Sequence, residues 1–164
     1  MLDEKTINDI CKWIESYEPK PKKTKIVNSS PSGRPIFGMI IMNEVEKDLD
    51  ENDEQFSEVL MKFLNKKKMD NVYCYNHAYI RQETFSRIYS GERKPTKEQA
   101  ARLALSMRLD IDDYDELLKA ASYARSNNKK DPLAVVGWCI AHNEYELADV
   151  EEAVFTITGK HLYE

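Results

Sequence analysis

Apolar side chains recur at helical spacing along most of this 164-residue chain, and this pattern restricts the fold more than any other feature. The clearest stripe occupies positions i, i+3, i+4, i+7 and i+8 and consists of Phe56, Val59, Leu60, Phe63 and Leu64. Such spacing gives a helix one apolar face, which must be buried against other elements. Polar residues, glycines and prolines interrupt the stripes at short intervals, so we expect several short helices that pack on one another.

The residues between the stripes set the expected helix boundaries. In the central part we expect helices over residues 56–67, 70–78, 81–90, 97–109 and 112–123. Gly91 ends the third of these helices, and Pro95-Thr96 opens the fourth. Nearer the C-terminus, Asp131-Pro132 suits the N-cap and first position of another helix, and a last helix begins near Leu147 and ends at Gly159.

Residues 1–19 predict a single amphipathic helix. Asp3 is suited to the N-cap position. One apolar face is formed at helical spacing by Ile7, Ile10, Cys11 and Ile14. The segment Glu18-Pro19-Lys20-Pro21 ends the helix, because proline lacks a backbone donor and disfavours helix in the residue before it.

Residues 20–54 differ in composition and predict a linker or arm. Proline, glycine and serine are frequent up to Pro35, and Lys20, Lys22, Lys23, Lys25 and Arg34 make this part basic. It is either a solvated tether or an arm that touches phosphate or an acidic partner. The apolar run 36–42 is either a strand or a buried helical turn, and as a strand it would pair with residues 25–27 in a small β-hairpin.

Charge is distributed unevenly along the chain. The 24 Lys and Arg residues and 29 Asp and Glu residues give a net charge of −5, which argues against a general nucleic-acid binder. Residues 56–130, however, hold 15 basic and 10 acidic residues, a net charge of +5. The acidic excess lies in the flanks, with net charges of −4 over residues 1–55 and −6 over residues 131–164.

Other features exclude several classes of protein. No segment approaches the ~20 consecutive apolar residues of a membrane span, and the first residues lack a signal-peptide pattern, so we expect a cytoplasmic protein without membrane contact. The three cysteines are far apart and form no C-x-x-C motif, and the three histidines are scattered, so we expect reduced thiols and no metal or cofactor. No nucleophile–base set or phosphate loop is recognisable, and we therefore expect no enzymatic activity.

The most specific pattern spans residues 80–95. It resembles the helix-turn-helix of the phage-repressor/Cro (XRE-like) family, whose third helix reads Thr-hydrophobic-Ser-x-Ile-x-x-Gly-x-Arg-x-Pro. The matching residues are Thr84, Phe85, Ser86, Ile88, Gly91, Arg93 and Pro95. The resemblance covers about residues 55–124. It implies a mainly α-helical chain with a five-helix, lambda-repressor-like domain over residues 55–125 and a C-terminal extension of two helices over residues 126–164.

Two features depart from the family pattern. The family's second helix is rich in Gln, Glu and Ala, whereas residues 72–77 read Val-Tyr-Cys-Tyr-Asn-His. The glycine usual in the following turn is replaced by Tyr79. Either Tyr79 adopts a left-handed backbone angle, or the turn is reshaped.

The resemblance implies that the third helix presents its exposed N-terminal residues to DNA bases in the major groove. Gln can pair with adenine, Arg with guanine and Glu with cytosine. The candidates for base contacts are Gln82, Glu83, Ser86 and Arg87. The candidates for phosphate contacts are Asn71, Arg93, Lys94, Lys66, Lys67 and Lys68. Alternatively, these residues form a solvated surface, in which Arg93 pairs with Glu92 or Glu98 and the lysines complement a helix end.

We therefore expect a DNA-binding helix-turn-helix protein, a transcriptional regulator that reads the major groove with residues 82–90. The alternative is a protein-interaction module, such as an adaptor or antitoxin-like subunit of a phage-related or bacterial defence system, that uses the fold without binding DNA. The C-terminal helices either pack onto the domain or contact a protein partner or second copy. Residues 55–158 are also similar to a helical module that occurs alone or C-terminal to macro domains in bacterial proteins.

Overall fold

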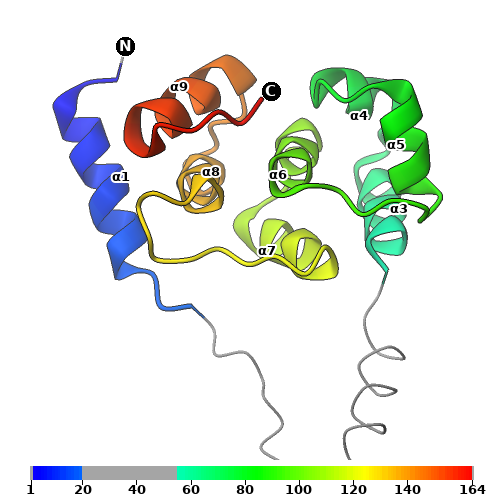
Figure 1. Cartoon of the computed structure of the whole chain (residues 1–164), viewed down its shortest axis with the longest axis horizontal. Coiled ribbons are helices and arrows are strands. Elements are labelled where there is room, and N and C mark those ends of the chain that lie inside the picture. The colour runs from blue at the N-terminus through cyan, green and yellow to red at the C-terminus, as the bar shows by residue number, and fades with distance from the viewer. Residues whose placement is uncertain (1, 20–54, 164) are drawn as a thin grey trace, which may run out of the picture. The chain divides into compact units, whose positions relative to one another are not determined.

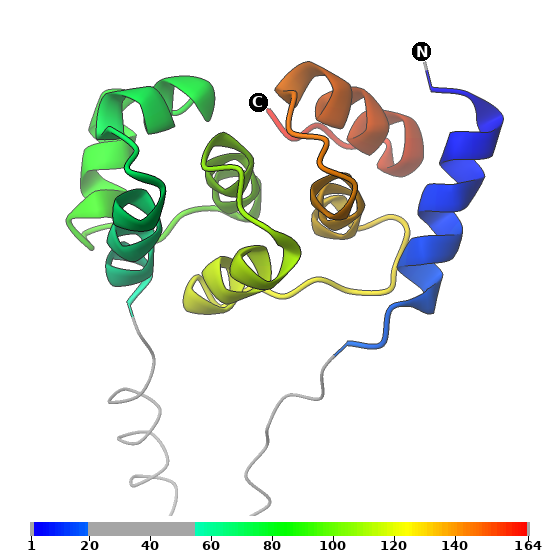
Figure 2. The same ribbon diagram turned by 180° about the vertical axis from the view of Figure 1, so that it is seen from behind.

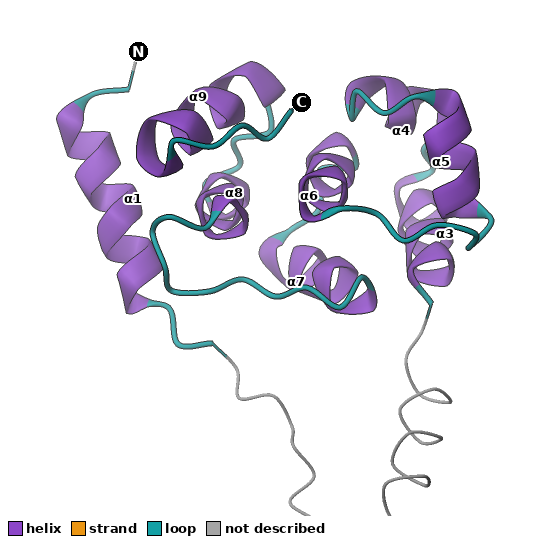
Figure 3. Cartoon of the chain, viewed as in Figure 1, coloured by secondary structure: helices purple, strands orange, loops and turns teal. Residues whose placement is uncertain are grey.

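The computed structural model describes residues 2–19 and 55–163 (Figure 1). Within these ranges all regular structure is helical (Figure 3). The helices are α1 (Glu4–Ser16), α3 (Phe56–Lys67), α4 (Asn71–His77), α5 (Gln82–Tyr89), α6 (Lys97–Ser106), α7 (Ile111–Ala120), α8 (Pro132–Ala141) and α9 (Leu147–Thr158). The expected mainly α-helical class is confirmed for this part of the chain. The arm over residues 20–54, with its apolar run 36–42 and β-hairpin, lies outside the described residues.

Side-chain caps explain where several helices begin. The Asp3 carboxylate accepts a hydrogen bond from the Thr6 amide at 3.1 Å, and Asp131 accepts one from the Leu133 amide at 3.1 Å, as expected for both N-caps. Thr96 and Gln99 form a reciprocal capping box at the start of α6. The helix expected from Asp112 begins at Ile111, because the Asp110 side chain accepts from the Asp113 amide at 2.8 Å and caps it.

Residues other than glycine adopt the left-handed conformation at the ends of five of the described helices. The residues with positive φ that are not glycine are Lys68, Tyr79, Arg108, Ser122 and Asn143, with φ between 50° and 61°. In each case the next amide bonds back into the helix, for example Ile80 to the Tyr75 carbonyl at 2.9 Å. Such a turn ends α6 at Ser106 and α7 at Ala120, earlier than the expected ends at 109 and 123. Tyr79 adopts the left-handed angle, the first of the two alternatives for this turn.

The helices bury one continuous apolar core. Helix α3 packs against α5 and α7, α4 packs against α5 and α6, and α6 packs against α7 and α8. The two C-terminal helices pack onto the rest of the chain, with α8 in contact with α6, α7 and α9. Helix α1 buries Ile10 and Ile14, the centre of its expected apolar face, and contacts α8. Consequently α1 and α5 lie at opposite ends of this helical unit in both views (Figure 1, Figure 2).

Candidate nucleic-acid interface

Helix α5 is strongly amphipathic and is anchored by its apolar side. Phe85 and Ile88 are only 2% and 1% exposed. The Phe85 ring packs against Tyr75 of α4 and Tyr89 of α5, with centroid separations of 5.4 and 5.9 Å. These contacts fix which side of α5 faces away from the core.

The outward side of α5 carries all four residues expected to contact bases. Gln82, Glu83, Ser86 and Arg87 are exposed. Across residues 2–19 and 55–163, the side chains of Gln82, Glu83 and Arg87 make no hydrogen bond or ion pair. The structure therefore brings the four candidates together on one accessible surface, which we call the α5 face.

The turn before α5 is supported from two directions. Tyr79 occupies its left-handed position, and its carbonyl accepts a hydrogen bond of 3.4 Å from Nη1 of Arg102 in α6. The Tyr163 ring, near the C-terminus, meets the Tyr79 ring edge-on at 5.4 Å. Exposed Arg81 then occupies the N-cap of α5, beside the α5 face. The family pattern did not single out Arg81, although a basic residue directly before the helix was a usable signal.

The phosphate-contact candidates next to α4 and α5 lie at the ends of these helices. Asn71 is the first residue of α4 and is partly exposed. Arg93 and Lys94 are exposed after α5, where the Arg93 amide donates to the Arg87 carbonyl at 3.1 Å. The Lys94 ammonium lies 5.0 Å from the Tyr123 ring centroid. In the described part of the chain Arg93 forms no ion pair with a carboxylate, so the pairing with Glu92 or Glu98, the alternative to phosphate contact, is not seen.

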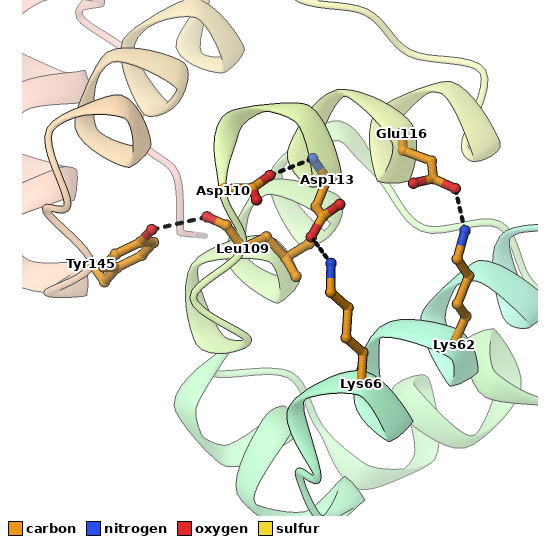
Figure 4. A network of polar contacts seen from close by, with 7 residues as sticks. All are labelled: Lys62, Lys66, Leu109, Asp110, Asp113, Glu116 and Tyr145. Carbon is orange, nitrogen blue, oxygen red and sulfur yellow. Dashed lines mark hydrogen bonds and ion pairs between the residues drawn. The ribbon is translucent and has the colours of Figure 1, made fainter.

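The α3 lysines divide into two groups. The Lys66 ammonium pairs with Asp113 of α7 at 2.8 Å, beside a pair between Lys62 and Glu116 at 2.6 Å (Figure 4). The hydrogen bond to Asp113 raises the pKa of Lys66. Lys67 and Lys68 are exposed and form no ion pair within the described ranges. Lys66 thus joins α3 to α7, whereas its two neighbours present their charge to solvent.

The acidic C-terminal extension does not cover the α5 face. Helix α9, which carries Asp149, Glu151 and Glu152, packs against α8 at the end of the unit away from α5 (Figure 1, Figure 2). Glu151 is occupied locally, since its carboxylate meets Nδ1 of His161 at 2.6 Å and accepts from the Leu162 amide at 2.7 Å. The exposed residues of α5 therefore face solvent rather than these carboxylates.

Cys74 and Cys139 are buried thiols. Burial raises the pKa of Cys74 to about 11 and that of Cys139 to about 12, which disfavours the nucleophilic thiolate. Among residues 2–19 and 55–163, no group of three or more His, Cys, Asp or Glu side chains is arranged to hold a metal ion. None of the helices described is long and apolar enough to cross a membrane.

No protein-family model, curated protein or solved structure matches the chain.

Proposed function

We propose that residues 55–125 form a lambda-repressor-like helix-turn-helix domain and that the protein binds duplex DNA with α5 in the major groove. The succession of short helices from α3 to α7 supports this proposal. The left-handed Tyr79 between α4 and α5 supports it further, because this family usually has a glycine there. In this arrangement α5 is the helix that reads bases.

The observation that carries the proposal is the division of α5 into two sides. Phe85 and Ile88 are buried, while Gln82 and Arg87 project from the opposite side without partners among the described residues. The exposed side carries Gln82 and Glu83 in the first turn of α5 and Arg87 in its last turn. Gln can bond adenine at two points and Arg can bond guanine at two points, so this side has the chemistry of base recognition.

Basic residues around the α5 face supply the second component of DNA binding. Arg81 precedes α5, Arg93 and Lys94 follow it, and Lys67 and Lys68 end α3. Phosphate contacts release counterions from DNA, so affinity should fall steeply as salt increases. Two groups of carboxylates that contribute to the net charge of −5 do not oppose this component. Those of α9 lie at the end of the unit away from α5, and Asp113 and Glu116 of α7 are paired with Lys66 and Lys62 of α3.

The test is selection of binding sites from a random-sequence duplex library by the full chain, followed by fluorescence anisotropy at several salt concentrations. We expect one enriched sequence. Replacing Arg87 by Ala should weaken binding by about 1–3 kcal/mol and relax specificity at one base pair. The charge reversal Arg87→Glu should abolish sequence preference. Lys12→Glu, the same charge change on exposed α1, should retain it.

Two results would contradict DNA binding by α5. One is the absence of any enriched sequence together with no salt-dependent affinity for duplex DNA. The other is equal loss of affinity in Arg87→Glu and Lys12→Glu, which would indicate a response to net charge rather than contact by α5.

A second candidate function, a protein-interaction module such as an adaptor or antitoxin-like subunit, is favoured by a different observation. Helix α4 and the turn after it expose large apolar side chains, with Val72, Tyr73 and Tyr79 exposed by 49%, 47% and 68%. Side chains of this size on a surface often mark contacts with other proteins. Measurement of DNA affinity separates the two functions, since the module would show none.

A further inference from the structure

A surface groove of about 320 Å³ lies between three separate parts of the chain. One wall is α4 with its following turn, a second is the segment that leads into α9, and the floor is the C-terminal end of α6. The lining side chains used below are those of Tyr73, Asn76, Tyr79, Arg108, Tyr145 and Glu146. None of them belongs to the α5 face.

The aromatic rings of the groove are held in place before any partner binds. Tyr73 stacks on His77 with a centroid separation of 3.7 Å, and Nδ1 of His77 donates to the Tyr73 carbonyl at 2.8 Å. The Tyr145 hydroxyl donates to the Leu109 carbonyl at 3.0 Å (Figure 4). Tyr79 is held by its edge contact with Tyr163. These contacts favour one position of each ring, which lowers the side-chain entropy lost when a partner binds against it.

One cation lies beside these rings. Arg108 is exposed, and its guanidinium lies 5.7 Å from the Tyr145 ring centroid. In the chain as described, Arg108 forms no ion pair with a carboxylate. An unpaired guanidinium next to aromatic surface matches a ligand that combines a carboxylate with an apolar side chain.

We propose that this groove binds a short peptide segment of a protein partner, with an apolar side chain against Tyr73 and Tyr79 and a carboxylate against Arg108. A nucleic-acid strand fits less well, because it carries a negative charge on every phosphate and Glu146 also lines the groove, whereas a peptide can place a single carboxylate at Arg108. Tyrosine and arginine are also the residues that most often carry binding energy at protein interfaces. The inference rests on the protein-interaction part of the second candidate function, and it holds whether or not α5 binds DNA.

Two groove residues offer variants that preserve the backbone. Arg108 and Tyr79 have φ angles of 50° and 53°, a region that glycine occupies without strain. Arg108→Gly therefore removes the cation, and Tyr79→Gly removes the exposed ring, without opposing the local conformation. Ser122→Gly is the matched control, because Ser122 has a φ of 61° at the end of α7 and does not line the groove.

The test starts from a phage-displayed library of random short peptides selected on the full chain. Enriched peptides are then synthesised with a fluorescent label, and their affinities are measured by anisotropy. We expect them to combine Asp or Glu with Leu, Phe or Tyr. Arg108→Gly and Tyr79→Gly should each weaken binding about tenfold or more, and Ser122→Gly should leave it unchanged. Thermal melting of each variant shows whether the fold is retained.

Three outcomes would overturn the proposal. No peptide is enriched, the enriched peptides are basic, or their affinity is unaffected by both groove variants. A labelled single-stranded oligonucleotide serves as the other probe: if Arg108→Gly abolishes its binding but not that of the peptides, the groove binds nucleic acid instead. Arg87→Glu should leave peptide affinity unchanged, so failure of DNA binding and failure of peptide binding are distinguishable.

Discussion

The Arg125 guanidinium forms a two-point ion pair with the Asp115 carboxylate, with Nε to Oδ1 at 2.5 Å and Nη2 to Oδ2 at 2.7 Å. The same guanidinium lies 4.2 Å from the Tyr17 ring centroid and 5.6 Å from that of Trp13. Asp115 belongs to α7, and the two rings belong to α1 and its C-cap. One buried side chain therefore joins the N-terminal helix to the central helices.

Arg125→Ala should lower the free energy of unfolding by about 3 kcal/mol, because it removes a buried partner of Asp115 and the cation between two rings. Arg125→Lys should cost less, since it keeps the charge but loses the two-point geometry. Urea denaturation of both variants gives these values. A loss for Arg125→Ala no larger than that for an exposed lysine, such as Lys12→Ala, would show that the pair contributes little.

Replacing Gly137 of α8 by alanine should change the free energy of unfolding in opposite directions, depending on whether Arg125 is present. A Cβ atom at this position would lie 2.7 Å from Cδ of Arg125, which the ion pair and the rings prevent from moving away. Gly137→Ala should therefore destabilise the protein by about 1–3 kcal/mol. In an Arg125→Ala background the same change should stabilise it by up to about 1 kcal/mol, because alanine favours helix over glycine. A double-mutant cycle of unfolding free energies that is additive would contradict this close packing.

The sequence pattern predicts helix positions far better than it predicts these long-range contacts. Helix α3 spans the expected 56–67, because its stripe is long and regular and Lys68 ends it. The docking of α1 on α8 has no sequence signal, since any helix with an apolar face such as Ile10 and Ile14 can pack on several others. Arg125 lies in an irregular segment, so neither a helical nor a strand pattern of side chains indicates that it pairs with Asp115, ten residues earlier in the chain.

The same distinction applies to the two candidate sites. All residues of the α5 face belong to one helix, so helical periodicity and the family resemblance were enough to predict that Gln82 and Arg87 lie on the same side. The groove takes Tyr73, Arg108 and Tyr145 from three elements, and only the packed structure brings them together. The sequence did not indicate the left-handed backbone at Arg108 either, because glycine is the usual signal for such a position and none is present there.

Ser122→Gly should raise the free energy of unfolding by about 0.5–1 kcal/mol. Ser122 has a φ of 61°, a left-handed angle that is unfavourable for a residue with a Cβ atom, and its side chain is exposed. Lys119→Gly, three residues earlier within α7, should instead destabilise the protein by about 1 kcal/mol. Chemical denaturation of the pair checks the prediction, and equal effects of the two glycines would refute it.

Stability should decrease at alkaline pH through the buried thiols. Burial raises the pKa of Cys139 to about 12 and that of Cys74 to about 11, whereas cysteine in an unfolded chain titrates near ~8.5. The folded state therefore holds these protons after the unfolded state has lost them. The stabilisation is complete below the unfolded pKa and is lost as pH rises towards the folded values.

Cys139→Ala should make the decline in unfolding free energy between about pH 8.5 and 10 shallower. Ile140→Val, a truncation at the neighbouring buried position, should lower stability by a similar amount at every pH. Urea denaturation across this pH range compares the two slopes. Identical slopes in the wild type and in Cys139→Ala would show that this thiol does not govern the decline.

Because Lys66 is paired with Asp113, we expect Lys67 and Lys68 to be better phosphate ligands than Lys66. Lys66 would have to leave a carboxylate before it could bind phosphate, whereas Lys67 and Lys68 have no such competitor in the described structure. If α3 borders bound DNA, Lys67→Ala or Lys68→Ala should reduce the slope of log affinity against log salt by about one. Lys66→Ala should leave that slope unchanged, and Asp113→Asn should steepen it by releasing the Lys66 charge. Anisotropy titrations at graded salt concentrations measure all four slopes, and a slope lowered by Lys66→Ala alone would reverse the ranking.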